Sequence, residues 1–103
     1  MLAFSRTGSV LKPEGELTIF EAAEACRRLR EELDAGGDLQ LDLSAVAELD
    51  TAGVQVLLWL KREARSRGSA VPFAHHSPAV LEVFDRLNLA GVFGDILVIA
   101  PSA

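Results

Sequence analysis

The stretch Asp50-Thr51-Ala52-Gly53 precedes an apolar helical segment, and its residue types suit either of two kinds of work. The open first turn of a helix exposes N–H groups without intrahelical partners and carries a partial positive charge. Asp50 or Thr51 can cap that turn, and because polar caps are common, capping alone is a sufficient explanation of both residues. Gly53 is unfavourable inside a helix by about 1 kcal/mol relative to Ala, so close backbone packing or access to the helix end must compensate for it. The stretch therefore either only starts a helix or forms a working surface at the helix end.

The residues that follow divide this helix into two faces, at about 3.6 residues per turn. The face expected to contact a sheet carries Gly53, Val54, Leu57, Leu60 and Ala64. The opposite face carries Thr51, Gln55, Trp59, Arg62 and Ser66. Large apolar groups at a surface mark interaction sites, and Trp and Arg are enriched among binding hot spots. Trp59 is then either covered by another element, such as the third helix, or an exposed anchor for a partner, and we favour the anchor.

The histidines and the cysteine offer little chemistry. His75 and His76 are the only candidates for acid–base catalysis, but adjacent residues on a strand point to opposite faces and cannot form one site. No Glu-x-x-His or cysteine pair completes a metal set, and no glycine-rich loop is suited to nucleotide phosphates. The single Cys26 excludes an internal disulfide and falls on an apolar helical stripe, as a small buried hydrophobe does. We therefore expect no enzyme, no cofactor and no metal.

Length and composition bound the class of protein. With 103 residues, of which 50% are hydrophobic and 24% charged, the chain is expected to form a single globular domain over residues 1–103. Its net charge of −5 argues against direct binding to nucleic acid or to an anionic membrane, since both require clustered Lys and Arg. No segment has the length of a membrane span or the pattern of a signal peptide, so we expect no membrane insertion and a cytoplasmic location.

Periodicity, capping and turn signals predict an alternation of strands and helices. In chain order we expect strands near 2–5 and 9–12, a helix from the Thr18–Glu21 capping box to Gly36-Gly37, a strand at 39–43, a helix at 51–67, a strand at 70–74, a helix capped by Ser77 with Pro78 at its first position, and a strand at 95–100. The first two strands form a hairpin, and Pro13–Gly15 is expected to break the chain after it. The expected buried stripes are Ile19, Ala22, Cys26, Leu29 and Leu33 in the first helix and Val80, Phe84 and Leu87 in the third.

This order predicts the fold class. Strand–helix–strand alternation favours parallel pairing with right-handed crossovers, and the opening hairpin adds an antiparallel strand. We therefore expect an α/β fold, a mixed sheet with helices packed on it.

Two segments together resemble a known family. They are LQLDLSAVAELDTAGVQVLLWLKREARSRGSAV and SPAVLEVFDRLNLAGVF, and the earlier GELT fits as well. An apolar strand ending in Asp-Leu-Ser, an Asp-Ser/Thr-x-Gly helix start and a later Ser-Pro-Ala-Val helix resemble, in this order, the STAS domain of sulfate transporters and bacterial anti-sigma factor antagonists. The resemblance covers nearly the whole chain and implies the fold expected above.

The resemblance also implies a function and a site. In the antagonist branch, an anti-sigma factor that is also a serine/threonine kinase phosphorylates the Ser or Thr after the Asp, which here is Thr51. The resemblance then implies a bacterial regulator that binds this kinase or another signalling protein through the helix start, Asp50, Thr51, Ala52 and Gly53. The outer face of the helix extends the expected contact to Gln55, Trp59 and Arg62. The best-known antagonists have two serines where this chain has Thr51-Ala52. A Thr here also occurs in a branch that binds the ATPase subunit of a phospholipid-transport ABC complex, and other relatives serve chemotaxis systems, so unphosphorylated docking is the alternative.

Overall fold

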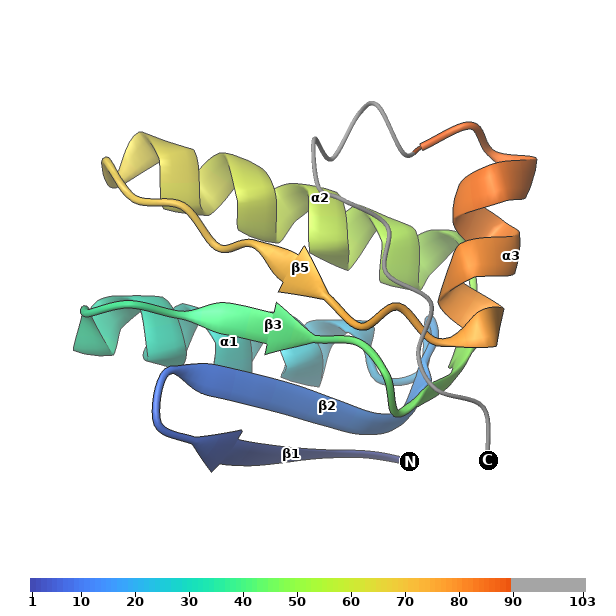
Figure 1. Ribbon diagram of the computed structural model, residues 1–103, viewed down its shortest axis with the longest axis horizontal. Helices are drawn as coiled ribbons and strands as arrows, with labels where there is room; N and C mark the ends of the chain where they lie inside the picture. Colours follow the sequence, from blue (N-terminus) through green and yellow to red (C-terminus); the bar gives the residue numbers. More distant parts are fainter. Residues whose placement is uncertain (90–103) are drawn as a thin grey trace.

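The computed structural model describes residues 1–89, in which a five-stranded mixed sheet is accompanied by three helices (Figure 1). The elements are β1 (Leu2–Thr7), β2 (Val10–Leu17), α1 (Ala22–Ala35), β3 (Gln40–Asp42), β4 (Val46–Leu49), α2 (Thr51–Ser66), β5 (Phe73–Ala74) and α3 (Pro78–Arg86). The predicted α/β fold with an opening antiparallel hairpin is confirmed. The strand expected at 95–100 lies outside the described residues.

Strand β2 organises the sheet. It pairs antiparallel with β1, and parallel first with β3 and then with β4, while β3 pairs parallel with β5. The prediction had one strand between the first two helices, and the structure has two. In β4 only Val46 and Leu49 are buried, so the alternation that reveals a strand in a sequence is missing from this segment.

The break expected at Pro13–Gly15 is wrong, because β2 runs through it. Pro13 lies between the part of β2 that pairs with β3 and the part that pairs with β4, where no parallel strand requires an N–H donor. Gly15 has φ +117°, and a Cβ there would come within 2.2 Å of the Met1 carbonyl oxygen. This glycine therefore serves close strand packing and not a turn.

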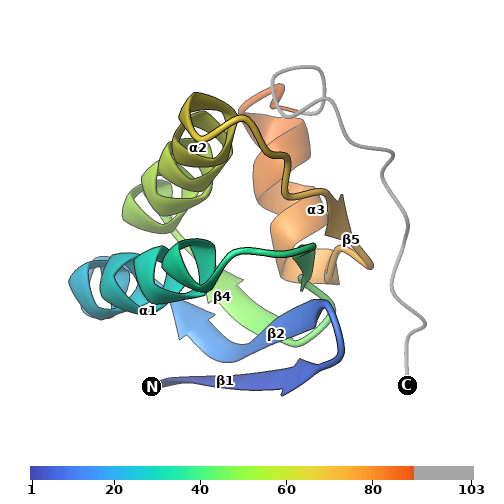
Figure 2. The same cartoon turned by 90° about the vertical axis from the view of Figure 1, so that its left-hand side faces the viewer.

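Helices α1 and α2 lie side by side against the sheet, and α3 packs against β4 (Figure 2). The predicted inner face of α2 is confirmed, since all of its residues are buried: Gly53, Val54, Leu57, Leu60 and Ala64. They join buried side chains of the sheet, such as Leu11, Leu17 and Leu41, in one core. At the ends of α1 and α3, Gly36 with φ +74° and the Ser77 cap are as predicted.

Two expected helix faces need correction. Helix α1 begins at Ala22, four residues after Thr18, so Ile19 lies outside the helix and is 66% exposed. The Thr18 hydroxyl donates to the Glu21 carboxylate at 2.7 Å, and no side chain caps the helix. In α3, Val80 and Phe84 are buried as expected, but Leu87 follows the last helical residue and is 46% exposed.

Candidate functional site

Asp50 alone caps α2. It precedes the helix in an extended conformation, and its Oδ1 accepts a hydrogen bond from the Gly53 N–H at 2.9 Å. Its second oxygen, Oδ2, accepts from the Ile19 N–H at 2.9 Å. One carboxylate therefore ties the start of α2 to the loop between β2 and α1, although 31 residues separate the two partners in sequence.

Gly53 is explained by close packing, one of the two reasons considered above. A Cβ at this position would come within 2.2 Å of the Leu17 carbonyl oxygen and 2.6 Å of the Leu49 Cδ1 atom. The Asp50 N–H also reaches the Leu17 carbonyl, at 3.4 Å. The first turn of α2 is thus pressed onto the end of β2, which holds the helix start in a fixed place.

Thr51 is the first residue of α2 and is exposed. Within residues 1–89 its hydroxyl makes no hydrogen bond, because the capping position is already occupied by Asp50. Capping therefore accounts for Asp50 and leaves Thr51 without a structural task. The hydroxyl lies open to solvent at the positive end of a helix of 16 residues.

The outer face of α2 is only partly as expected. Gln55 and Arg62 are exposed, but Trp59 is half-buried and packs against the core. Neither expectation for Trp59 is fully right: it is not a free anchor, and the element beside it is α1. The guanidinium of Arg30 lies 5.2 Å from the centre of the Trp59 ring.

Trp59 lines a groove between α1 and α2, which we call the α1–α2 groove. It is a hollow of about 520 Å³ lined by Ala22, Ala23, Cys26, Ala52, Gln55, Val56, Trp59 and Arg62. The structure therefore brings together four of the predicted site residues, Ala52, Gln55, Trp59 and Arg62, and adds a wall from α1. Asp50, Thr51 and Gly53 lie at the end where α2 begins.

Sequence reasoning missed Ile19 and Phe20. Phe20 is 91% exposed and Ile19 66% exposed, and both lie in the loop that Asp50 holds. One signal was available: two large apolar neighbours cannot both lie on a single narrow helical stripe. Exposed apolar side chains beside an unused hydroxyl make the start of α2 a candidate contact surface for another molecule.

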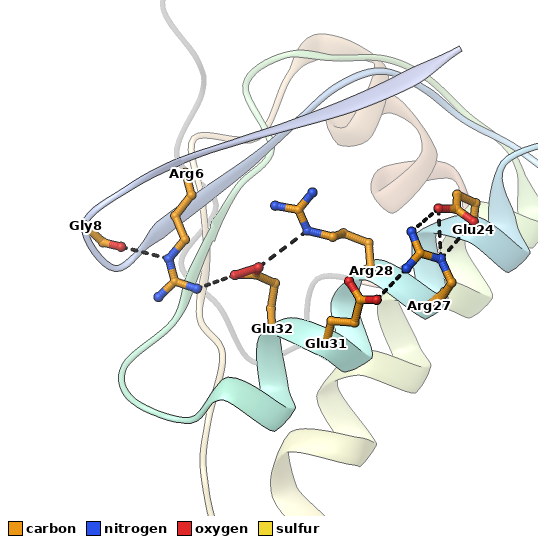
Figure 3. A network of polar contacts seen from close by, with 7 residues as sticks. All are labelled: Arg6, Gly8, Glu24, Arg27, Arg28, Glu31 and Glu32. Carbon is orange, nitrogen blue, oxygen red and sulfur yellow. Dashed lines mark hydrogen bonds and ion pairs between the residues drawn. The ribbon is translucent and has the colours of Figure 1, made fainter.

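The arginines of α1 fall into two groups. Arg27 bonds to Glu24 and Glu31, and Arg28 bonds to Glu32, which also binds Arg6 of β1 (Figure 3). The hydrogen bond from Arg27 lowers the pKa of Glu24 and raises the pKa of the guanidinium itself. Arg30 has no ion pair in the part of the chain described, and the same is true of Arg62 on α2.

The remaining polar candidates do not form a catalytic site. Burial raises the pKa of the Cys26 thiol, which keeps it protonated in the groove wall. His75 is exposed with φ +56° just after β5, whereas His76 is buried and meets the Phe84 ring edge-on at 5.5 Å. Among residues 1–89, no three His, Cys, Asp or Glu side chains are grouped to hold a metal ion. No helix in that range is long and apolar enough to cross a membrane.

A family model matches nearly the whole chain. The family model described as Mlab, STAS domain, matches residues 1–99. Among curated proteins, no sequence matches this chain.

Solved structures share the fold at low identity. A Thermotoga maritima protein described as an anti-sigma factor antagonist is 22% identical, with a TM-score of 0.72 over 98% of this chain and 86% of its own. Unphosphorylated SpoIIAA, also described as an anti-sigma factor antagonist, is 16% identical, with a TM-score of 0.66 over 98% and 90%. Phosphorylated SpoIIAA, described as a Bacillus cell fate determinant, is 16% identical, with a TM-score of 0.67 over 99% and 93%.

Proposed function

This chain belongs to the STAS domain family, and we propose that it is a regulatory protein-binding module switched by phosphorylation of Thr51. The observation that carries the proposal is that two different residues cap α2 and expose a hydroxyl at its start. Asp50 caps the helix and holds the neighbouring loop, so the exposed Thr51 hydroxyl is free for modification. The module needs no catalytic group, cofactor or metal of its own.

The proposed partner is a cytoplasmic serine/threonine kinase of the anti-sigma factor type, or another signalling protein. It binds the exposed end of α2 through Thr51 and Ala52 and extends along Gln55, Trp59 and Arg62, with Asp50 and Gly53 holding the helix start in place. The similarity to structures of anti-sigma factor antagonists supports this kind of partner. In the modification step, the γ-phosphoryl group of ATP bonds to the Thr51 oxygen, ADP leaves, and the hydroxyl proton is released.

The physical effect of the phosphate is expected at the surface and not in the fold. A phosphate on Thr51 adds a charge of about −1.5 to −2 at the positive end of α2, where anions are stabilised. The same group stands beside Asp50 and near the exposed Glu48, so it makes an already acidic surface more negative. Repulsion and steric obstruction then prevent the partner from binding.

The alternative is docking without phosphorylation, as the ATPase-binding subunit of a phospholipid-transport ABC complex or as part of a chemotaxis system. The exposed Ile19 and Phe20 support a docking surface here in either case. The alternative differs only in giving Thr51 no covalent role.

The test is to purify the protein from its own host as wild type, T51A and T51E, to map phosphorylation sites and to identify the proteins retained. We expect phosphate on Thr51, and a kinase that is retained by wild type and T51A but lost by T51E. A wild-type protein without phosphate, and the same partners on all three variants, would refute the switch. A transporter ATPase bound to unmodified protein would support the docking alternative.

A further inference from the structure

We infer that the α1–α2 groove receives a short amphipathic helix of the protein partner, and that a carboxylate of this helix is held between Arg30 and Arg62. The inference rests on the proposed function, since it specifies the segment that the partner brings to the surface. It adds α1, which the site expected from the sequence did not include, and it gives a role to Arg30 and Arg62, which have no ion pair within residues 1–89.

The floor of the groove is apolar. Ala22 and Cys26 of α1 face Ala52 and Val56 of α2 across the hollow, which is open to solvent. Phe20, 91% exposed, is a further apolar side chain in the loop before α1. A row of apolar side chains from a partner would remove this surface from water, which is the main source of favourable free energy in association.

A helix fits this groove better than a strand. The groove walls are two α-helices whose backbone N–H and C=O groups are bonded internally, so an extended segment would find no backbone partners there. A helix satisfies its own backbone and contacts the groove with side chains alone. From Ala52 to Trp59 the wall rises by about 10 Å, which matches about two turns of a docked helix.

The charges favour an acidic residue at one end of the docked helix. Arg27 and Arg28 are already engaged with carboxylates of α1, as Figure 3 shows. Arg30 and Arg62 are both exposed, make no ion pair within residues 1–89, and flank Trp59. An arginine fork that an aromatic ring holds in place, as Trp59 holds Arg30, is suited to bind a carboxylate.

The same charges set the orientation of the docked helix. Glu48 and Asp50 lie at the end where α2 begins, and Arg62 lies three turns further along the helix. The acidic residues of the partner helix therefore lie over Arg30 and Arg62, away from Thr51.

The test uses a phage-displayed library of amphipathic helical peptides of about 16 residues, with a fixed apolar stripe and randomised polar positions. The library is selected against the wild-type protein with unmodified Thr51. Affinities of selected peptides are measured from the fluorescence of Trp59, because it is the single tryptophan of the chain and lies in the groove. We expect Asp and Glu to be enriched at one end of the selected peptides.

Two variants separate the groove from the rest of α2. R30E/R62E should reduce the affinity for a selected peptide about tenfold. Changing the acidic residues of the peptide to Lys should restore its binding to this variant. R65E reverses one charge, where R30E/R62E reverses two, on an exposed residue of α2 outside the groove, and should change the affinity less than about twofold. An unfolding curve for each variant checks that the fold is retained.

The inference would be overturned by a selection that yields no binder, by peptides without acidic enrichment, or by equal effects of R30E/R62E and R65E. A wild-type dimer that R30E/R62E dissociates would assign the groove to a second copy of the chain and overturn it as well. Failure of the phosphorylation switch is a separate result. Retention of the partner by T51E would refute the proposed function, whereas peptide binding that depends on Arg30 and Arg62 would still support the groove.

Discussion

Helices α2 and α3 both begin with a polar residue in an extended conformation whose side chain accepts a hydrogen bond from the first turn. At α3 this residue is Ser77, which is 3% exposed; its Oγ accepts from the Val80 N–H at 3.2 Å and donates to the Val46 carbonyl at 2.6 Å. At α2 the capping residue is Asp50, and the hydroxyl residue that follows it, Thr51, is exposed. The hydroxyl of α3 is part of the fold, whereas the hydroxyl of α2 is not.

The difference separates two meanings of the same sequence signal. A Ser or Thr at a helix start is usually a cap, and Ser77 fits that description completely. Thr51 does not, because another side chain has taken the cap. A hydroxyl that the fold does not use, at a helix end fixed by Asp50 and Gly53, is available for regulation.

The largest effect is expected from G53A, which tests whether the start of α2 is held by packing. Helix propensity alone would make this substitution stabilising by about 1 kcal/mol. We expect it to destabilise the protein by about 3 kcal/mol, because the new methyl group would collide with the Leu17 carbonyl oxygen. Chemical denaturation measures the change.

A control substitution measures the cost of glycine relative to alanine in a helix without close packing. A23G, at an exposed position of α1, should cost about 0.5–1 kcal/mol, as expected for a glycine in a helix. A G53A protein at least as stable as wild type would show that Gly53 is not needed for close packing.

The next largest effect is expected from S77A. The substitution removes the cap of α3 and leaves the Val46 carbonyl without the Ser77 hydroxyl, so we expect a loss of about 2 kcal/mol. S66A is the matched control: its hydroxyl also donates to a carbonyl, that of Glu63 at 2.8 Å, but the site is exposed and the loss should stay below about 0.5 kcal/mol. Equal losses of unfolding free energy in S77A and S66A would show that the buried and the exposed hydroxyl contribute equally to stability.

A smaller effect is expected from D50A, with a loss of about 1.5 kcal/mol from the cap of α2. Amide hydrogen exchange should show that Ile19 loses protection at the same time, because its N–H donates to the same carboxylate. D50N is the sharper variant: its single carbonyl oxygen can accept the N–H of Gly53 or of Ile19, but not both in the present geometry. Unchanged protection of both amides in D50N would contradict the dual role of Asp50.

Much of α2 could be predicted from its sequence, because its stripe repeats at the helical period and its inner residues are buried as expected. The start of α1 could not. The Thr18–Glu21 pattern is a local signal for a helix start, yet the Ile19 N–H is bound by Asp50, which is 31 residues away in the chain. A signal read from neighbouring residues cannot include that bond, and so the exposed Ile19 and Phe20 were missed.

Trp59 illustrates the same limit within the site. The helical period put it on the face opposite the buried stripe of α2, but the side chain is half-buried and packs against the core. The period does not say which element stands beside that face. In the structure this element is α1, whose Arg30 guanidinium lies over the Trp59 ring. Likewise β4 was missed because its two central residues are exposed, and its place beside β2 comes from pairing between distant segments.

The most direct test of the central claim compares protein carrying phosphothreonine at position 51 with the unmodified protein. Both are unfolded in urea, and both are titrated with the partner recovered from the host. We predict free energies of unfolding that agree within about 0.5 kcal/mol, because the phosphate lies at the favourable end of α2, together with loss of partner binding. A loss of stability of about 2 kcal/mol or more, or unchanged binding, would contradict the claim that Thr51 serves regulation and not the fold.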